Sequence, residues 1–202
     1  MKTSRLFFAW EIQMPPGRNI HLISSALSDL TEGQDPLFRP VMPRNYHVTA
    51  IFLGNQPDEL IPYLSKCLME FKPQYTEPLL VPVRGIGGMP SLQKPNSFHI
   101  SLEDPGKRLE SQKAALEHRL LTMKPDPALQ WSPENRPFRP HLTLGYKRKH
   151  TDYAELAEVL TLFGVSWQAL VPELRKGLSL APVPRLFKST LLPEGPRYQT
   201  LA

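Results

Sequence analysis

Two segments of the sequence carry the same arrangement of a histidine and a threonine. They are His47-Val48-Thr49-Ala50 and His141-Leu142-Thr143-Leu144. Because residues i and i+2 of a strand point to the same face, each segment sets an imidazole beside a hydroxyl while the apolar neighbours face the core. A histidine pair can hold one neutral imidazole as general base and one imidazolium as general acid. Such a pair can cleave a phosphodiester without a metal, with the threonine hydroxyls bound to the non-bridging oxygens.

Strands and helices that alternate along the chain must position these segments. Runs of β-favouring residues predict strands at positions 5–13, 45–53, 79–84, 97–102, 138–146, 186–191 and 198–201. Apolar residues at helical spacing predict helices at positions 16–32, 60–71, 105–124 and 153–160. Glycines and prolines predict loops at positions 36–43 and 85–95. The interleaving of the two element types predicts a mixed α and β class.

Composition bounds the kind of protein that carries these motifs. The chain has 202 residues, of which 41% are hydrophobic, and no shift in composition marks a linker, so residues 1–202 are expected to form one unit and to act as a monomer. The net charge of +5 favours a polyanionic partner, nucleic acid above all. No stretch approaches the roughly 18 apolar residues of a membrane span. The single cysteine, Cys67, excludes an internal disulfide, indicates a cytoplasmic setting, and is expected to be buried.

The flanks of the two motifs extend the pattern. The residues concerned are Arg5-Leu6-Phe7-Phe8-Ala9, Asn45-Tyr46-His47-Val48-Thr49, Phe52-Leu53-Gly54, Arg136-Pro137-Phe138-Arg139-Pro140-His141-Leu142-Thr143-Leu144, Leu186-Phe187-Lys188-Ser189 and Gly195-Pro196-Arg197-Tyr198. In these segments the chain resembles the two-histidine phosphoesterase superfamily, in particular its RNA 2',3'-cyclic phosphodiesterases, also called 2'-5' RNA ligase-like proteins.

The resemblance implies both a fold and an activity. The fold is α+β and bilobal, with two pseudo-twofold-related lobes of mainly antiparallel sheet around a central cleft. The activity is the metal-independent and cofactor-free opening of an RNA 2',3'-cyclic phosphate end to a 2'-phosphate, with His47 and His141 as the acid/base pair. Thr49 and Thr143 are the implied phosphate-binding residues, and the same site run backwards would join 2'-5' linkages.

The residues after the second motif depart from the family. Members commonly carry an arginine five residues after the second histidine, and this chain has Tyr146 there. In an unbulged strand Lys147 shares the face of His141, so Lys147 is expected to replace the missing cation, and Arg148 would do so only through a bulge. A role for both as solvated charges at a strand end is the alternative.

Cationic and aromatic residues near the motifs are further candidates for substrate binding. Arg139 directly precedes the second motif and, with the other cations near the two motifs, is expected to attract RNA phosphates; the others are Arg39, Arg44, Lys147, Arg148 and Lys149. Scattered surface charge that serves solubility is the alternative for most of them. Tyr46 directly precedes the first motif and could stack on a nucleobase. For Phe7 and Phe8, core packing is the expected role.

Other interpretations stay open at this point. The segment His99-Ile100-Ser101 has the same spacing and competes for one of the two sites. Zinc is a weaker alternative because catalytic zinc normally takes three protein ligands and no carboxylate lies at a ligand spacing from either motif. A catalytically silent RNA-binding module and a phosphodiesterase for a small cyclic nucleotide, such as ADP-ribose 1'',2''-cyclic phosphate, are the functional rivals.

Overall fold

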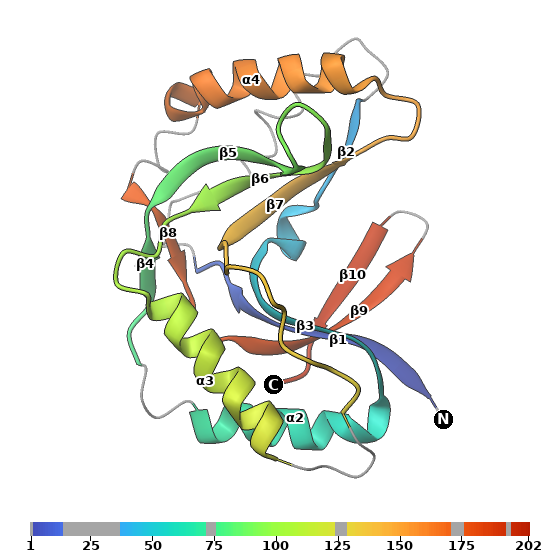
Figure 1. Ribbon diagram of the computed structural model, residues 1–202, viewed down its shortest axis with the longest axis vertical. Coiled ribbons are helices and arrows are strands. Elements are labelled where there is room, and N and C mark those ends of the chain that lie inside the picture. The colour runs from blue at the N-terminus through green and yellow to red at the C-terminus, as the bar shows by residue number, and fades with distance from the viewer. Residues whose placement is uncertain (1, 14–36, 72–75, 124–128, 171–175, 193–194) are drawn as a thin grey trace.

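The computed structural model describes residues 2–13, 37–71, 76–123, 129–170, 176–192 and 195–202 (Figure 1). The strands are β1 (Thr3–Glu11), β2 (Phe38–Pro40), β3 (His47–Pro57), β4 (Leu79–Val81), β5 (Val83–Pro90), β6 (Pro95–Leu102), β7 (His141–Lys147), β8 (Leu178–Leu180), β9 (Arg185–Leu192) and β10 (Gly195–Thr200). The helices are α2 (Ile61–Phe71), α3 (Arg108–Thr122) and α4 (Tyr153–Leu170), with single 3-10 turns at Pro43–Asn45 and Asp58–Leu60. The helix predicted for positions 16–32 lies outside the described residues.

One antiparallel sheet runs through the molecule and joins two halves. The strand order is β10-β9-β1-β3-β7-β6-β5, and β2 also pairs with β7. Strands β3 and β7 meet through one register pair, Val48 and Leu142. In Figure 1, β1, β9 and β10 lie on one side of this junction, whereas β5 and β6 lie on the other. The predicted α+β class with antiparallel pairing is confirmed.

Helices cover each half from one side and leave the opposite face of the sheet for the motifs. Helix α4 contacts β5 and β6, whereas α2 and α3 contact β9 and β3 at the opposite end of the molecule (Figure 1). Beneath them Leu6, Phe8 and Trp10 of β1 are fully buried. The indole of Trp10 donates a hydrogen bond to Oε1 of Gln112 at 2.9 Å, which ties α3 to β1. Phe7 and Ala9 on the other face of β1 are also buried, but they belong to a separate small cluster with Phe187, so the main core lies on the face of Leu6, Phe8 and Trp10.

The glycine-rich segment predicted as a loop is instead the strand β5. A Cβ at Gly87 would lie 2.5 Å from Nε2 of His99, and a Cβ at Gly88 would lie 2.6 Å from the carbonyl oxygen of Ser91. These glycines therefore allow close approach inside a sheet rather than a change of direction. The proline-rich segment likewise contains the short strand β2, in which Pro40 stands at the end.

Candidate active site

The junction of β3 and β7 brings the two predicted motifs together. Val48 and Leu142 are paired and fully buried, so by alternation the histidines and threonines on either side of them share the opposite face. An antiparallel pair has a local twofold axis, and here it relates one motif to the other. The register sets His47 opposite Thr143 and Thr49 opposite His141.

Both imidazoles make the same backbone contact. Nδ1 of His47 lies 2.7 Å from the carbonyl oxygen of Asn45, and Nδ1 of His141 lies 2.8 Å from the carbonyl oxygen of Arg139. Because a carbonyl can only accept, Nδ1 carries the proton in each ring. Each Nε2 is therefore the nitrogen left to exchange a proton with substrate.

Aromatic rings surround His47. The ring centroid of Phe7 lies 5.0 Å from that of His47, and the centroid of Tyr198 lies 5.1 Å away in an edge-on arrangement. Burial lowers the pKa of His47 from 6.5 to about 4, the Asn45 carbonyl opposes this shift, and the nearby His141 adds to it. In the unliganded protein His47 is therefore neutral at neutral pH.

His141 has a third histidine beside it. His99 of β6 is 9% exposed, and its ring centroid lies 4.9 Å from that of His141. The pairing of β6 with β7 sets His99 opposite Thr143 and Ser101 opposite His141, so the rival motif shares the catalytic face. Burial and the neighbouring His141 lower the pKa of His99 to about 4. His99 lacks the backbone contact that orients the other two rings, since its buried Nδ1 has no hydrogen-bond partner in the described part of the chain.

A bulge in β7 changes which residue follows Thr143 on the catalytic face. The register with β6 slips between the pairs Phe98–Gly145 and His99–Thr143. Gly145 consequently faces the core, where a Cβ would lie 2.6 Å from the ring of Phe98. The next residue, Tyr146, therefore turns toward the catalytic face.

The expectation that Lys147 replaces the missing cation is wrong because of this bulge. Its ammonium donates hydrogen bonds to the carbonyl oxygens of Arg148 and Thr151, and it lies 4.6 Å from the ring centroid of Tyr153. Lys147 therefore holds the turn after β7 and is not aimed at a phosphate. Arg148 is exposed beyond the strand end, where its backbone N–H donates to the carbonyl oxygen of Leu37.

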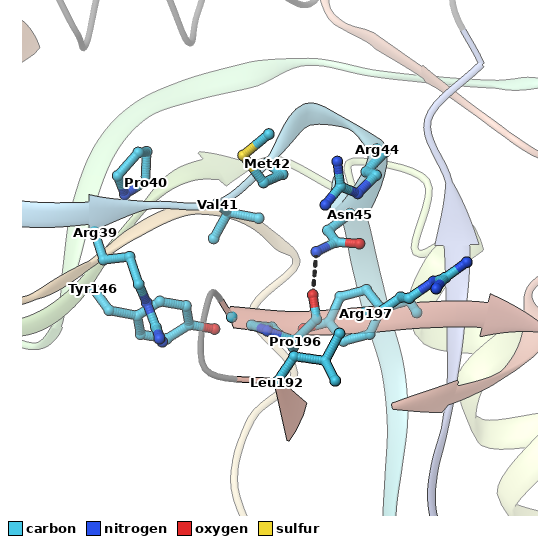
Figure 2. Close-up of a pocket in the computed structure, with 12 residues that line it drawn as sticks. Arg39, Pro40, Val41, Met42, Arg44, Asn45, Tyr146, Leu192, Pro196 and Arg197 are labelled. Carbon is cyan, nitrogen blue, oxygen red and sulfur yellow. Dashed lines mark hydrogen bonds between the residues drawn. The ribbon is translucent and has the colours of Figure 1, made fainter. Parts of the chain in front are cut away.

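A cavity of about 520 Å³ opens next to Asn45, whose carbonyl oxygen contacts His47, and Figure 2 shows the residues that line it. Tyr146 and Tyr198 line it together with Arg39 and Arg44, and Asn45 anchors its rim through a 2.6 Å hydrogen bond from Nδ2 to the carbonyl oxygen of Pro196. Sequence reasoning singled out Tyr146 only as a departure from the family, grouped Arg39 and Arg44 with the cations expected to attract RNA phosphates, and gave Tyr198 no role of its own. The sequence held only a weak signal that Arg39 and Tyr198 line a cavity, because Arg39 lies in a proline-rich segment and Tyr198 in a terminal hairpin.

The remaining predicted residues divide between the site and the core. Arg139 is exposed and lines a second cavity, with His99, Ser101 and His141. Tyr46 is 6% exposed and belongs to the hydrophobic core, so the expectation that it stacks on a base is wrong. Cys67 is fully buried, as expected, and its thiol lies 3.3 Å from the sulfur of Met123.

The described residues hold neither a candidate metal cluster nor a helix that could span a membrane. Within them no three His, Cys, Asp or Glu side chains group as a metal site. Of the helices in the same ranges, none has the length and apolarity to cross a membrane.

A sheet that presents two twofold-related His-x-Thr pairs on one open face places the chain in the two-histidine phosphoesterase class. Two solved structures share this fold: that of a Thermus thermophilus protein, at TM-score 0.58 and 21% identity over 98% of this chain and 95% of the other, and that of Escherichia coli LigT complexed with 3'-AMP, at TM-score 0.58 and 19% identity over 100% and 97%.

Sequence comparison gives the family. The 2'-5' RNA ligase superfamily model matches residues 23–175, and the chain belongs to that superfamily. A Thermus thermophilus protein named RNA 2',3'-cyclic phosphodiesterase is 29% identical over 167 residues, covering 81% of this chain and 73% of the relative.

Proposed function

We propose that the protein hydrolyses RNA or oligonucleotide 2',3'-cyclic phosphate ends to 2'-phosphates, without a metal or other cofactor. The observation that supports this most is the twofold-related placement of His47 with Thr49 and of His141 with Thr143 across the Val48–Leu142 pair. The activity named for the Thermus thermophilus relative points the same way. Residues 1–202 act in this proposal as one monomeric unit, because both motifs belong to one sheet of one chain.

The reaction needs two proton transfers at one phosphorus. Nε2 of one histidine accepts a proton from a water molecule whose oxygen attacks the phosphorus. The bond from phosphorus to the 3'-oxygen breaks, and this oxygen takes a proton from Nε2 of the other histidine. The product carries a 2'-phosphate and a free 3'-hydroxyl. A 5'-hydroxyl in place of water would give a 2'-5' linkage by the same steps.

The threonine hydroxyls stabilise the charge that develops. Thr49 and Thr143 lie on the same face as the imidazoles, and in this proposal their hydroxyls donate to the two non-bridging oxygens. Such donors accelerate the reaction to the extent that they bind the transition state more tightly than the cyclic phosphate.

The activity is tested with adenosine 2',3'-cyclic phosphate and with a short RNA ending in a cyclic phosphate, both in the presence of EDTA. We expect a 2'-phosphate product that is lost in His47→Ala and in His141→Ala and kept in Arg119→Gln, a control on α3 whose side chain pairs with Glu70. Salt-sensitive RNA binding without any product would favour the silent module. Turnover of ADP-ribose 1'',2''-cyclic phosphate alone would favour the small-nucleotide enzyme, and activity only with added zinc would overturn the acid/base mechanism.

A substrate with sulfur in place of the 3'-oxygen assigns the two roles. A thiolate leaves without a proton, so the variant that lacks the general acid should keep activity on this substrate while the variant that lacks the general base should not. Loss of activity in both variants would contradict the division into one acid and one base.

A further inference from the structure

Arg39 and Tyr146 form a pair at the mouth of the cavity beside His47. They are register partners on β2 and β7, and the guanidinium carbon of Arg39 lies 5.7 Å from the ring centroid of Tyr146. Figure 2 shows the Arg39 side chain lying along the Tyr146 ring, whereas the side chain of Arg197 points away from it. Stacking on an aromatic face fixes the plane of a guanidinium and leaves its N–H groups at the edge for a ligand.

In the part of the chain that the structure describes, no acidic side chain pairs with Arg39 or Arg44 of this cavity. Among the described residues that line the cavity there is no carboxylate. Burial raises the pKa of Tyr146, and it raises the pKa of Tyr198 to about 12, so both phenols keep their protons at neutral pH. A cavity lined by guanidinium groups and neutral phenols suits a phosphate.

The cavity adjoins the residues that contact His47. Asn45 and Tyr198 both line it, and both contact His47, one through its carbonyl oxygen and one through its ring. Tyr146 reaches it from β7, where the bulge turns this residue to the side of Thr143. A chain whose cyclic phosphate lies between the two histidines can therefore extend into this cavity without crossing the core.

We propose that Arg39, held by Tyr146 and aided by Arg44, binds a second phosphate of the substrate, the internucleotide phosphate next to the cyclic end. This inference rests on the proposed function and narrows its substrate class to oligonucleotides. Nucleoside cyclic phosphates fill the catalytic centre alone and leave the arginine–tyrosine site empty.

The test compares adenosine 2',3'-cyclic phosphate with the dinucleotide ApA ending in the same group. Relative to the wild type, Arg39→Gln should lower kcat/KM for the dinucleotide roughly tenfold and leave the mononucleotide unchanged within about twofold, since a charge-assisted hydrogen bond is lost. Tyr146→Leu should behave like Arg39→Gln, whereas Tyr146→Phe, which keeps the ring beside the guanidinium and removes only the phenol, should lose less of the dinucleotide activity than Tyr146→Leu. Arg119→Gln is the charge-matched control.

A dinucleotide whose internucleotide phosphate is replaced by an uncharged methylphosphonate isolates the contact. The wild type should process it as slowly as Arg39→Gln processes ApA, and Arg39→Gln should lose nothing further. Equal losses on the mononucleotide and the dinucleotide would place Arg39 at the reacting phosphate and overturn the proposal, as would no loss on either. A failed proposed function would differ from both results, because no substrate would then be hydrolysed by any variant.

The position of the second phosphate is tested with two further substrates. Adenosine 2',3'-cyclic phosphate carrying a 5'-phosphate should gain most of the advantage of the dinucleotide. A gain confined to ADP-ribose 1'',2''-cyclic phosphate would show that the site binds a diphosphate, and the inference of an oligonucleotide substrate would fail.

Discussion

His47 and His141 make the same backbone contact in different surroundings. The local twofold axis of β3 and β7 reproduces the register, the neighbouring threonine and the hydrogen bond from Nδ1 to the carbonyl two residues earlier. What differs is the wall, that is, the side chains packed against each ring. Phe7 and Tyr198 enclose the ring of His47, whereas buried His99 lies against the ring of His141. Backbone symmetry thus gives both rings the same geometry for the proposed proton transfers, whereas burial behind the aromatic wall keeps His47 neutral before substrate binds.

The first prediction is the largest effect and removes either half of the pair. We expect His47→Ala and His141→Ala each to lower kcat by about 10³, within the usual contribution of general acid–base catalysis. The double variant should be little worse than either single variant, because the two groups act in one step. The measurement is kcat on a cyclic phosphate, with circular dichroism to establish that each variant is folded. Losses that multiply in the double variant would show two independent halves.

The second prediction removes the hydroxyl beside each imidazole. Thr49→Val and Thr143→Val keep the side-chain shape and should each lower kcat by roughly 10- to 100-fold, with smaller changes in KM, because the hydroxyl binds charge that develops in the transition state. Thr122→Val, at the exposed end of α3, is the matched control. If one threonine matters and the other does not, the twofold relation does not extend to the phosphate.

The sequence predicted the motif geometry because alternation in a strand depends on local residue types. His47, Thr49 and Val48 follow the two-residue period, and burial of the apolar neighbour confirms the face that this period assigns. The expectation for Lys147 was wrong because one bulge inverts the period, and the bulge arises from the pairing of β6 with β7, far apart in sequence. The expectation that Tyr46 stacks on a base was wrong for a similar reason, since the core that buries this residue is assembled from distant segments.

The third prediction concerns a variant that removes part of the aromatic wall around His47. Phe7→Leu replaces the ring that packs on His47 with a smaller side chain, so water should reach the imidazole. The pKa of His47 should then rise from about 4 toward its ordinary value. We expect a rise of about one unit, read from the NMR titration of His47, and a change in kcat/KM of only a few-fold at neutral pH. Phe52→Leu, at an exposed ring of β3, should leave this pKa unchanged. An unaltered titration in Phe7→Leu would show that the aromatic wall does not set the protonation state of His47.

The fourth prediction concerns His99, which packs against His141, and it gives the smallest expected effect on activity. His99→Gln should change kcat by less than about threefold, because its imidazole is neutral and lacks the backbone contact that orients the catalytic rings. Its effect should instead appear in stability. His99 resists protonation when folded, so the unfolded chain binds a proton between about pH 6.5 and pH 4, and stability falls as the pH is lowered through this range.

His99→Gln should remove part of that loss, on the order of 1–2 kcal/mol between pH 7 and pH 4, measured by urea unfolding at each pH. His118→Gln, at an exposed histidine of α3, is the control and should unfold like the wild type at both values. A drop of a hundredfold or more in kcat for His99→Gln, with acid stability unchanged, would make His99 rather than His47 the partner of His141. Because His99-Ile100-Ser101 and His47-Val48-Thr49 flank β7 in the same register, this single variant decides which side of β7 holds the phosphate.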